Sequence, residues 1–93
     1  MLVLPADLTH REATACLQML VAGLRQDAGP TVVVDAAALG RFDSSALAVL
    51  LEFRREGLAA GKEVQVRAMP ERLRSLAALY GVAELLPEAV APG

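Results

Sequence analysis

The chain has 93 residues, of which 55% are hydrophobic and 3% aromatic, and its net charge is −2. This length predicts one domain spanning residues 1–93, and an acidic balance without a basic cluster argues against a nucleic-acid partner. The longest apolar run, Ala46–Leu51, is too short to cross a bilayer, no signal peptide is expected, and the single Cys16 excludes an internal disulfide, so we predict a cytoplasmic protein.

The hydrophobic fraction is high for a small domain, where about 45–50% is usual. Two interpretations remain open at this point. Either part of the apolar surface is covered by a partner, or the excess reflects the many alanines.

The first third of the chain is predicted to form a short strand and one helix. Leu2–Leu4 has the composition of a strand and is ended by Pro5. Thr9 and Glu12 have the spacing of a capping box, in which each side chain satisfies the backbone N–H of the other. The helix is predicted to reach about Gln26, because one face collects apolar residues at intervals of three and four: Ala13, Cys16, Leu17, Leu20, Val21 and Leu24.

The middle third contains a second strand and a second helix. The strand is Thr31–Val34, whose almost continuous apolar run is typical of a central strand covered on both faces. After a loop over residues 36–42, Ser44–Ala60 is predicted to be helical, with Gly61 placed for the C-cap. The first half of this helix is apolar nearly all round, so one side is expected to pack on the sheet and the other to meet a partner.

The last third repeats the same order. Glu63–Ala68 alternates between polar and apolar residues and is predicted to be a strand with one wet face. A third helix begins near Pro70 and ends at Gly81, with an apolar stripe of Leu73, Leu76, Ala77 and Tyr80. The alternation predicts an α/β fold, in which a mostly parallel sheet of three or four strands is packed with three or four α-helices.

Residues suited to catalysis are not grouped in the sequence. His10 is the only histidine, so a metal site with two histidine ligands is excluded, and nothing places His10 beside Ser44 or Cys16 as a base. There is no glycine-rich loop for a phosphate group. We therefore predict no enzymatic activity, no metal site and no cofactor.

Ser44 lies at the start of the second predicted helix and has two interpretations. As a helix cap it would contribute about 1 kcal/mol, although Asp43 is equally able to cap and would leave Ser44 or Ser45 free. Alternatively, its hydroxyl is exposed at a protein contact. A phosphate there would add a charge of about −1.5 to −2, which a helix N-terminus tolerates but which opposes binding at an apolar interface.

The segment Val33–Asp35, the following loop and then Asp43–Leu47 resemble the signature of STAS domains (sulfate transporter and anti-sigma antagonist). In that family an Asp–Ser/Thr pair opens the second helix. Leu4–His10 is similar to the first loop of the family, and Arg72–Pro87 resembles the C-terminal part of the small STAS subunits of Mla-type phospholipid ABC transporters. Two features differ: Ala46 stands where the family usually has Gly, and the first strand of the family has no counterpart.

The resemblance implies a small STAS-like fold and a non-catalytic interaction subunit. Such a subunit binds and stabilises or regulates the ABC ATPase of a phospholipid transport system that maintains outer-membrane lipid asymmetry. It would be cytoplasmic, and peripheral to the inner membrane only through the transporter. The expected contact residues are Ser44, Asp43, Ser45, Leu47, Ala48, Leu51, Thr9 and His10.

Two other functions remain open from the sequence. The resemblance also fits an anti-sigma factor antagonist that is controlled by phosphorylation of Ser44, although Ala46 in place of Gly counts against it. A small nucleotide-binding or catalytic protein is a third candidate, and the sequence offers it no phosphate site. In isolation, the missing first strand should leave an open sheet edge near Leu2–Leu4 or beside a neighbouring strand, which predicts a tendency to form homodimers or to swap strands.

Overall fold

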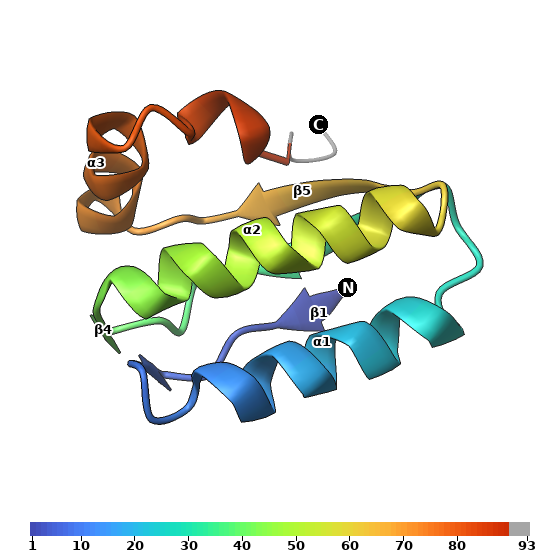
Figure 1. Ribbon diagram of the computed structural model, residues 1–93, viewed down its shortest axis with the longest axis horizontal. Coiled ribbons are helices and arrows are strands. Elements are labelled where there is room, and N and C mark those ends of the chain that lie inside the picture. The colour runs from blue at the N-terminus through green and yellow to red at the C-terminus, as the bar shows by residue number, and fades with distance from the viewer. Residues whose placement is uncertain (90–93) are drawn as a thin grey trace.

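Parallel strands connected by helices form the frame of the molecule, which the computed structural model describes over residues 1–89. The main sheet has the order β1-β3-β5, and a second sheet pairs β2 with β4 (Figure 1). The helices and strands are β1 (Leu2–Val3), β2 (Asp7–Leu8), α1 (Ala13–Gln26), β3 (Thr31–Asp35), β4 (Arg41–Phe42), α2 (Ser44–Ala59), β5 (Glu63–Arg67), α3 (Glu71–Leu79) and the 3₁₀ helix η1 (Ala83–Leu85). The predicted class, a mostly parallel α/β fold, is confirmed.

The main sheet is covered by helices on one face. β3 and β5 are paired in parallel from Thr31 opposite Glu63 to Asp35 opposite Arg67. The alternating pattern buries Val32, Val34, Val64 and Val66. The predicted two-sided cover of β3 is therefore wrong: Val33 is only half-buried, and Asp35 on the same face forms an ion pair with Arg67 at 2.9 Å.

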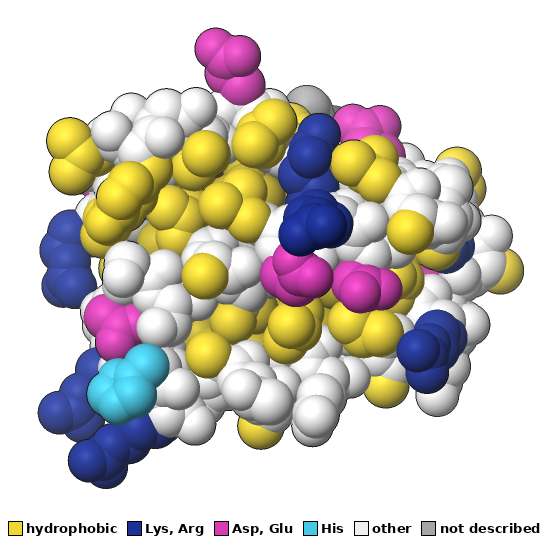
Figure 2. Space-filling view, viewed as in Figure 1, with side chains coloured by type: hydrophobic (Ala, Val, Ile, Leu, Met, Phe, Trp, Pro, Cys, Tyr) yellow, Lys and Arg dark blue, Asp and Glu magenta, His cyan; other side chains and the backbone are white. Residues whose placement is uncertain are grey.

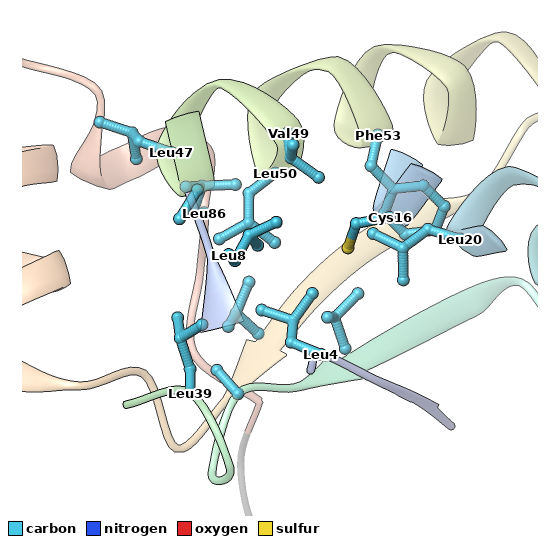
Figure 3. Close-up of a cluster of buried hydrophobic side chains, with 14 of the residues drawn as sticks. Leu4, Leu8, Cys16, Leu20, Leu39, Leu47, Val49, Leu50, Phe53 and Leu86 are labelled. Atoms are coloured by element: carbon cyan, nitrogen blue, oxygen red, sulfur yellow. The ribbon is translucent and has the colours of Figure 1, made fainter. Parts of the chain in front are cut away.

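The core lies between this sheet and the helices α1 and α2, which run side by side in front of it (Figure 1). Figure 3 shows leucine and valine side chains converging there around Phe53 and Cys16. Cys16 is buried as predicted for a small core residue. Every buried side chain in the described part of the chain is apolar.

The N-terminus of α1 differs from the predicted capping box in one half. The Glu12 carboxylate does reach back and accepts hydrogen bonds from the backbone N–H and the hydroxyl of Thr9, both at 2.9 Å. The Thr9 hydroxyl, however, accepts from the N–H of Arg11 rather than from that of Glu12. Residues 10–12 form a turn, and the helix begins only at Ala13.

The second sheet was not predicted, because each of its strands has only two residues. β2 and β4 place Asp7 opposite Arg41 and Leu8 opposite Phe42. The carbonyl of Ala6 also accepts hydrogen bonds from the N–H groups of Gly40 and Arg41. This pairing holds the loop before α1 against the loop before α2.

The C-terminal elements follow the prediction with small differences. Pro70 is the N-cap of α3 rather than its first helical residue, and Gly81 has the positive φ of 72° expected after the helix. Tyr80 is 60% exposed, so its assignment to the apolar stripe is wrong: it is the C-cap, where the chain leaves the helix. After η1 the chain returns to β5, where Glu88 forms a parallel bridge with Val66.

Gly57 allows α2 to approach β5 closely. A Cβ at this position would lie 2.6 Å from the Cγ2 of buried Val64. Alanine improves helix propensity by about 1 kcal/mol, whereas overpacking costs about 1–3 kcal/mol. We therefore expect Gly57→Ala to lower the free energy of unfolding by up to about 2 kcal/mol, measured by denaturant unfolding. Adding Val64→Ala should relieve part of the clash, and a Gly57→Ala protein more stable than the wild type would contradict the interpretation.

Among the described residues, β1 is the outermost strand on its side of the main sheet. The N–H of Leu4 donates to the carbonyl of Asp35 at 2.9 Å, so the alternation of a parallel pair turns the N–H and C=O of Val3 away from β3. The Val3 side chain is 53% exposed. We expect light scattering to detect homodimers of the wild type at high concentration. Val3→Lys should lower the fraction of dimer, because a lysine on an edge strand opposes pairing with another chain, and Thr31→Lys should leave that fraction unchanged. A strictly monomeric wild type would count against this prediction.

Candidate functional site

The start of α2 is organised by the carboxylate of Asp43. One oxygen, Oδ1, accepts a hydrogen bond from the backbone N–H of Ser45 at 2.8 Å, which makes Asp43 the N-cap. The other oxygen, Oδ2, accepts from the backbone N–H of His10 at 3.2 Å and lies 3.7 Å from the Nδ1 of that histidine. Asp43 therefore caps α2 and at the same time binds the turn that precedes α1.

These hydrogen bonds favour the ionised carboxylate. The N–H of Ser45 is the main cause that lowers the pKa of Asp43, the N–H of His10 adds to it, and partial desolvation opposes both. The pKa of Glu12 is lowered in the same way by the backbone and hydroxyl of Thr9. Both carboxylates around the site are therefore ionised at neutral pH.

Ser44 is exposed at the first position of α2. The cap is supplied by Asp43, so the N-terminal N–H groups do not need the Ser44 hydroxyl, and this hydroxyl forms no hydrogen bond within residues 1–89. Of the two alternatives raised by the sequence, capping thus falls to Asp43. The neighbouring Ser45 is half-buried.

Five of the other expected contact residues line two depressions, one of which includes Asp43 and the other Ser45. Thr9, His10 and Asp43 line an open polar hollow of about 500 Å³, together with Asp7, Arg11, Glu12 and Arg41. Ser45 and Ala48 line a groove of about 350 Å³ between α1 and α2, whose other lining residues are Ala13, Thr14, Leu17, Val49 and Glu52. The start of α2 therefore has a polar side and an apolar side.

Two leucines of α2 differ in their access to a partner. Leu51 is half-buried and packs against the edge of the core, so part of its side chain faces outward. Leu47 is only 3% exposed and belongs to the core (Figure 3). Leu47 was expected to contact a partner, but its packing against the core leaves almost no surface for such a contact.

One flank of α3 contributes exposed side chains that sequence reasoning did not assign to the site. The guanidinium carbon of Arg72 lies 4.7 Å from the centroid of the Phe42 ring. Phe42 is the residue directly before Asp43 in sequence. Leu76 and Leu79 follow at spacings of four and seven, on the same flank of α3, and Leu79 is 81% exposed. Figure 2 shows hydrophobic side chains gathered where Figure 1 places α3 and the first turns of α2.

Groups that would suggest catalysis do not assemble in the described part of the chain. Residues 1–89 contain no cluster of three or more side chains that could hold a metal ion. The only thiol, that of Cys16, is buried, and burial raises its pKa. Over the same residues, none of the helices combines the length and the apolar composition that crossing a bilayer requires.

Comparison with protein families matches residues 1–87 to the family described as "Mlab, STAS domain". The chain belongs to this STAS family. The match covers all the helices and strands from β1 to η1, together with the loop before α1 and the loop before α2. STAS domains are in general interaction modules rather than enzymes, which agrees with the exposed surface around Ser44. A search of curated proteins found no match.

The assignment of the cap to Asp43 can be tested by stability measurements. Ser44→Ala removes a hydroxyl that bonds nothing in the described chain, so we expect a change of unfolding free energy within about 0.5 kcal/mol. Asp43→Ala removes the acceptor for Ser45 and His10 and should lower the melting temperature measurably at neutral pH. A larger loss for Ser44→Ala than for Asp43→Ala would identify Ser44 as the cap.

The pH dependence of the protein's stability should also report the cap formed by the Asp43 carboxylate. The pKa of Asp43 is below its ordinary value of 3.8 in the folded protein, so its stabilisation is complete above pH 3.8. This stabilisation is lost as the pH falls further, through the lowered pKa of the folded state. The stability difference between wild type and Asp43→Ala should therefore narrow below pH 3.8, and a constant difference down to pH 2 would contradict the role of the ionised carboxylate.

Proposed function

We propose that this STAS domain is a non-catalytic interaction subunit that binds the ABC ATPase of a phospholipid transport system and stabilises or regulates it. The transport system would be one that maintains the lipid asymmetry of the outer membrane. The chain would then be cytoplasmic and would reach the inner membrane only through its complex with the transporter.

The observation that carries this proposal is the free hydroxyl of Ser44. Ser44 is the first residue of α2, directly after the N-cap Asp43, which supplies the capping oxygen. A small polar side chain that is exposed and not needed for the fold is suited to a contact with another protein.

The surroundings of Ser44 support the same proposal. Ala48 is exposed one turn further along α2, and Leu51 is half-buried two turns along. Small and apolar side chains on the outer side of a helix allow close approach of a partner surface with little desolvation cost. The expected contact residues carried into the proposal are Ser44, Asp43, Ser45, Ala48, Leu51, Thr9 and His10.

An anti-sigma factor antagonist is the second candidate. It is favoured by the exposure of Ser44, which would give a serine kinase access to the hydroxyl. Ala46, which replaces the usual Gly, has its methyl group fully buried in the core. The core therefore accommodates this alanine. We place the antagonist function second because Arg72–Pro87 resembles the transporter subunits.

The proposal is tested by capture of the ATPase with purified variants. Ser44→Glu should fold at least as well as Ser44→Ala, because a carboxylate suits a helix N-terminus, yet it should bind the ATPase less well. Leu51→Lys should greatly reduce binding while thermal melting still shows a folded protein. Thr31→Glu, at the start of β3, is the matched control and should bind normally.

Two results would contradict the proposal. If the wild type does not capture the ATPase, the proposed partner is wrong. If both Ser44→Glu and Leu51→Lys bind like the wild type, the start of α2 is not the contact surface.

A further inference from the structure

Three arginines near the start of α2 have no carboxylate partner within residues 1–89. Three of the other described arginines form ion pairs at 2.9–3.3 Å, namely Arg55 with Glu52, Arg67 with Asp35 and Arg74 with Glu88, whereas Arg25 and Arg54 do not. Arg11, Arg41 and Arg72 form none within 4.0 Å. Figure 2 shows basic side chains along the edge of the molecule that carries the histidine.

Two of the three carboxylates that line the polar hollow accept hydrogen bonds from other groups, and the third, Asp7, lies opposite Arg41 in the short sheet. Asp43 accepts from the N–H groups of Ser45 and His10, and Glu12 accepts from the N–H and hydroxyl of Thr9. Asp7, the third carboxylate that lines the polar hollow with Arg11 and Arg41, forms no ion pair with either of them. The N-terminus of α2 adds the positive end of a helix dipole.

Arg72 is positioned by Phe42, the residue between Arg41 and Asp43 in sequence. Its guanidinium lies over the Phe42 ring, a cation–π contact that leaves the N–H groups at the guanidinium edge available to an acceptor. The residue is exposed, and a planar guanidinium binds a carboxylate through two parallel hydrogen bonds. The site thus presents fixed donors that no described residue of the chain uses.

An apolar strip continues from Arg72 along the same side. Ser45 and Glu52 line the groove toward α1, so the helical rotation of 100° per residue places Leu51 on the opposite flank, toward α3. The facing flank of α3 carries Leu76 and Leu79, and Tyr80 follows as the C-cap of this helix. Leu79 and Tyr80 are among the most exposed large hydrophobic residues described. We define the α2–α3 strip as Leu51, Leu76, Leu79 and Tyr80.

We propose that the partner surface that covers this site is acidic, with carboxylates that pair with Arg72, Arg41 and Arg11 and apolar side chains that cover the α2–α3 strip. This inference rests on the proposed function, because it names the chemistry of the protein partner bound at Ser44. Complementary charge would orient the partner and raise the association rate, while the strip supplies the apolar contact. It also gives a reason why a negative charge on Ser44 would oppose binding: it would face carboxylates of the partner.

The sign of the partner's charge is tested by two substitutions at one position. Ser44→Glu and Ser44→Lys are similar in length and differ in charge. If the partner surface is acidic, Ser44→Glu should weaken binding to the ABC ATPase roughly tenfold or more, whereas Ser44→Lys should bind within about threefold of the wild type. Thermal melts of both variants report any loss of folding.

The arginines are tested by Arg72→Gln, Arg41→Gln and their combination, with Arg25→Gln on α1 as the matched control. Arg25 is also exposed and unpaired among the described residues. The double variant should lose roughly tenfold or more in affinity, and its affinity should depend less on salt concentration than that of the wild type. Arg25→Gln should match the wild type in both respects.

The outcomes separate this inference from the proposed function. Equal loss of binding by Ser44→Glu and Ser44→Lys, with normal binding by the arginine variants, would leave the contact at Ser44 in place and overturn the acidic partner. Normal binding by all variants, or no binding by the wild type, would overturn both. A last experiment measures binding to vesicles of phosphatidylcholine with phosphatidylglycerol. If the arginine variants lose binding to these vesicles but still bind the ATPase normally, the arginines contact a lipid surface instead.

Discussion

The carboxylate of Asp43 joins two segments that lie 33 residues apart in sequence. It caps α2 through Ser45 and holds the turn before α1 through the N–H of His10. The short pairing of β2 with β4 supports the same junction, because these strands directly precede the His10 turn and Asp43 in sequence. Because this one side chain satisfies the helix terminus, the adjacent Ser44 hydroxyl is left exposed, and the surface proposed for a partner depends on that arrangement.

The sheet is covered on one face only, and this limits where apolar residues can be buried. Val32, Val34, Val64 and Val66 meet α1 and α2, whereas the opposite face carries the Asp35–Arg67 ion pair. Both explanations offered for the hydrophobic composition find support in the exposed residues. Small alanines such as Ala48 lie on the surface, and so do large side chains such as Leu79, which a single helical layer does not cover.

The sequence by itself determined the order and type of the main elements. Hydrophobic periodicity placed the helices now seen at 13–26, 44–59 and 71–79 to within a few residues, because each buries one continuous stripe. Glycines at 61 and 81 marked helix ends through their positive φ angles of 74° and 72°. The pattern also marked the start of α2, where Asp and Ser side chains precede an apolar run, as the predicted contact position, and this remains a prediction.

Only the tertiary structure decided which of those side chains caps the helix and which remains free. Asp43 and Ser44 both have suitable oxygens, and the choice depends on the turn at His10, which no local pattern connects to residue 43. The same holds for β2 and β4, whose two residues each form a strand only because a distant segment supplies the hydrogen bonds. Leu47 and Leu51 are equivalent in the sequence pattern, yet Leu47 is buried in the core and Leu51 is only half-buried. The difference arises because the helical rotation points Leu47 more directly toward the sheet than Leu51.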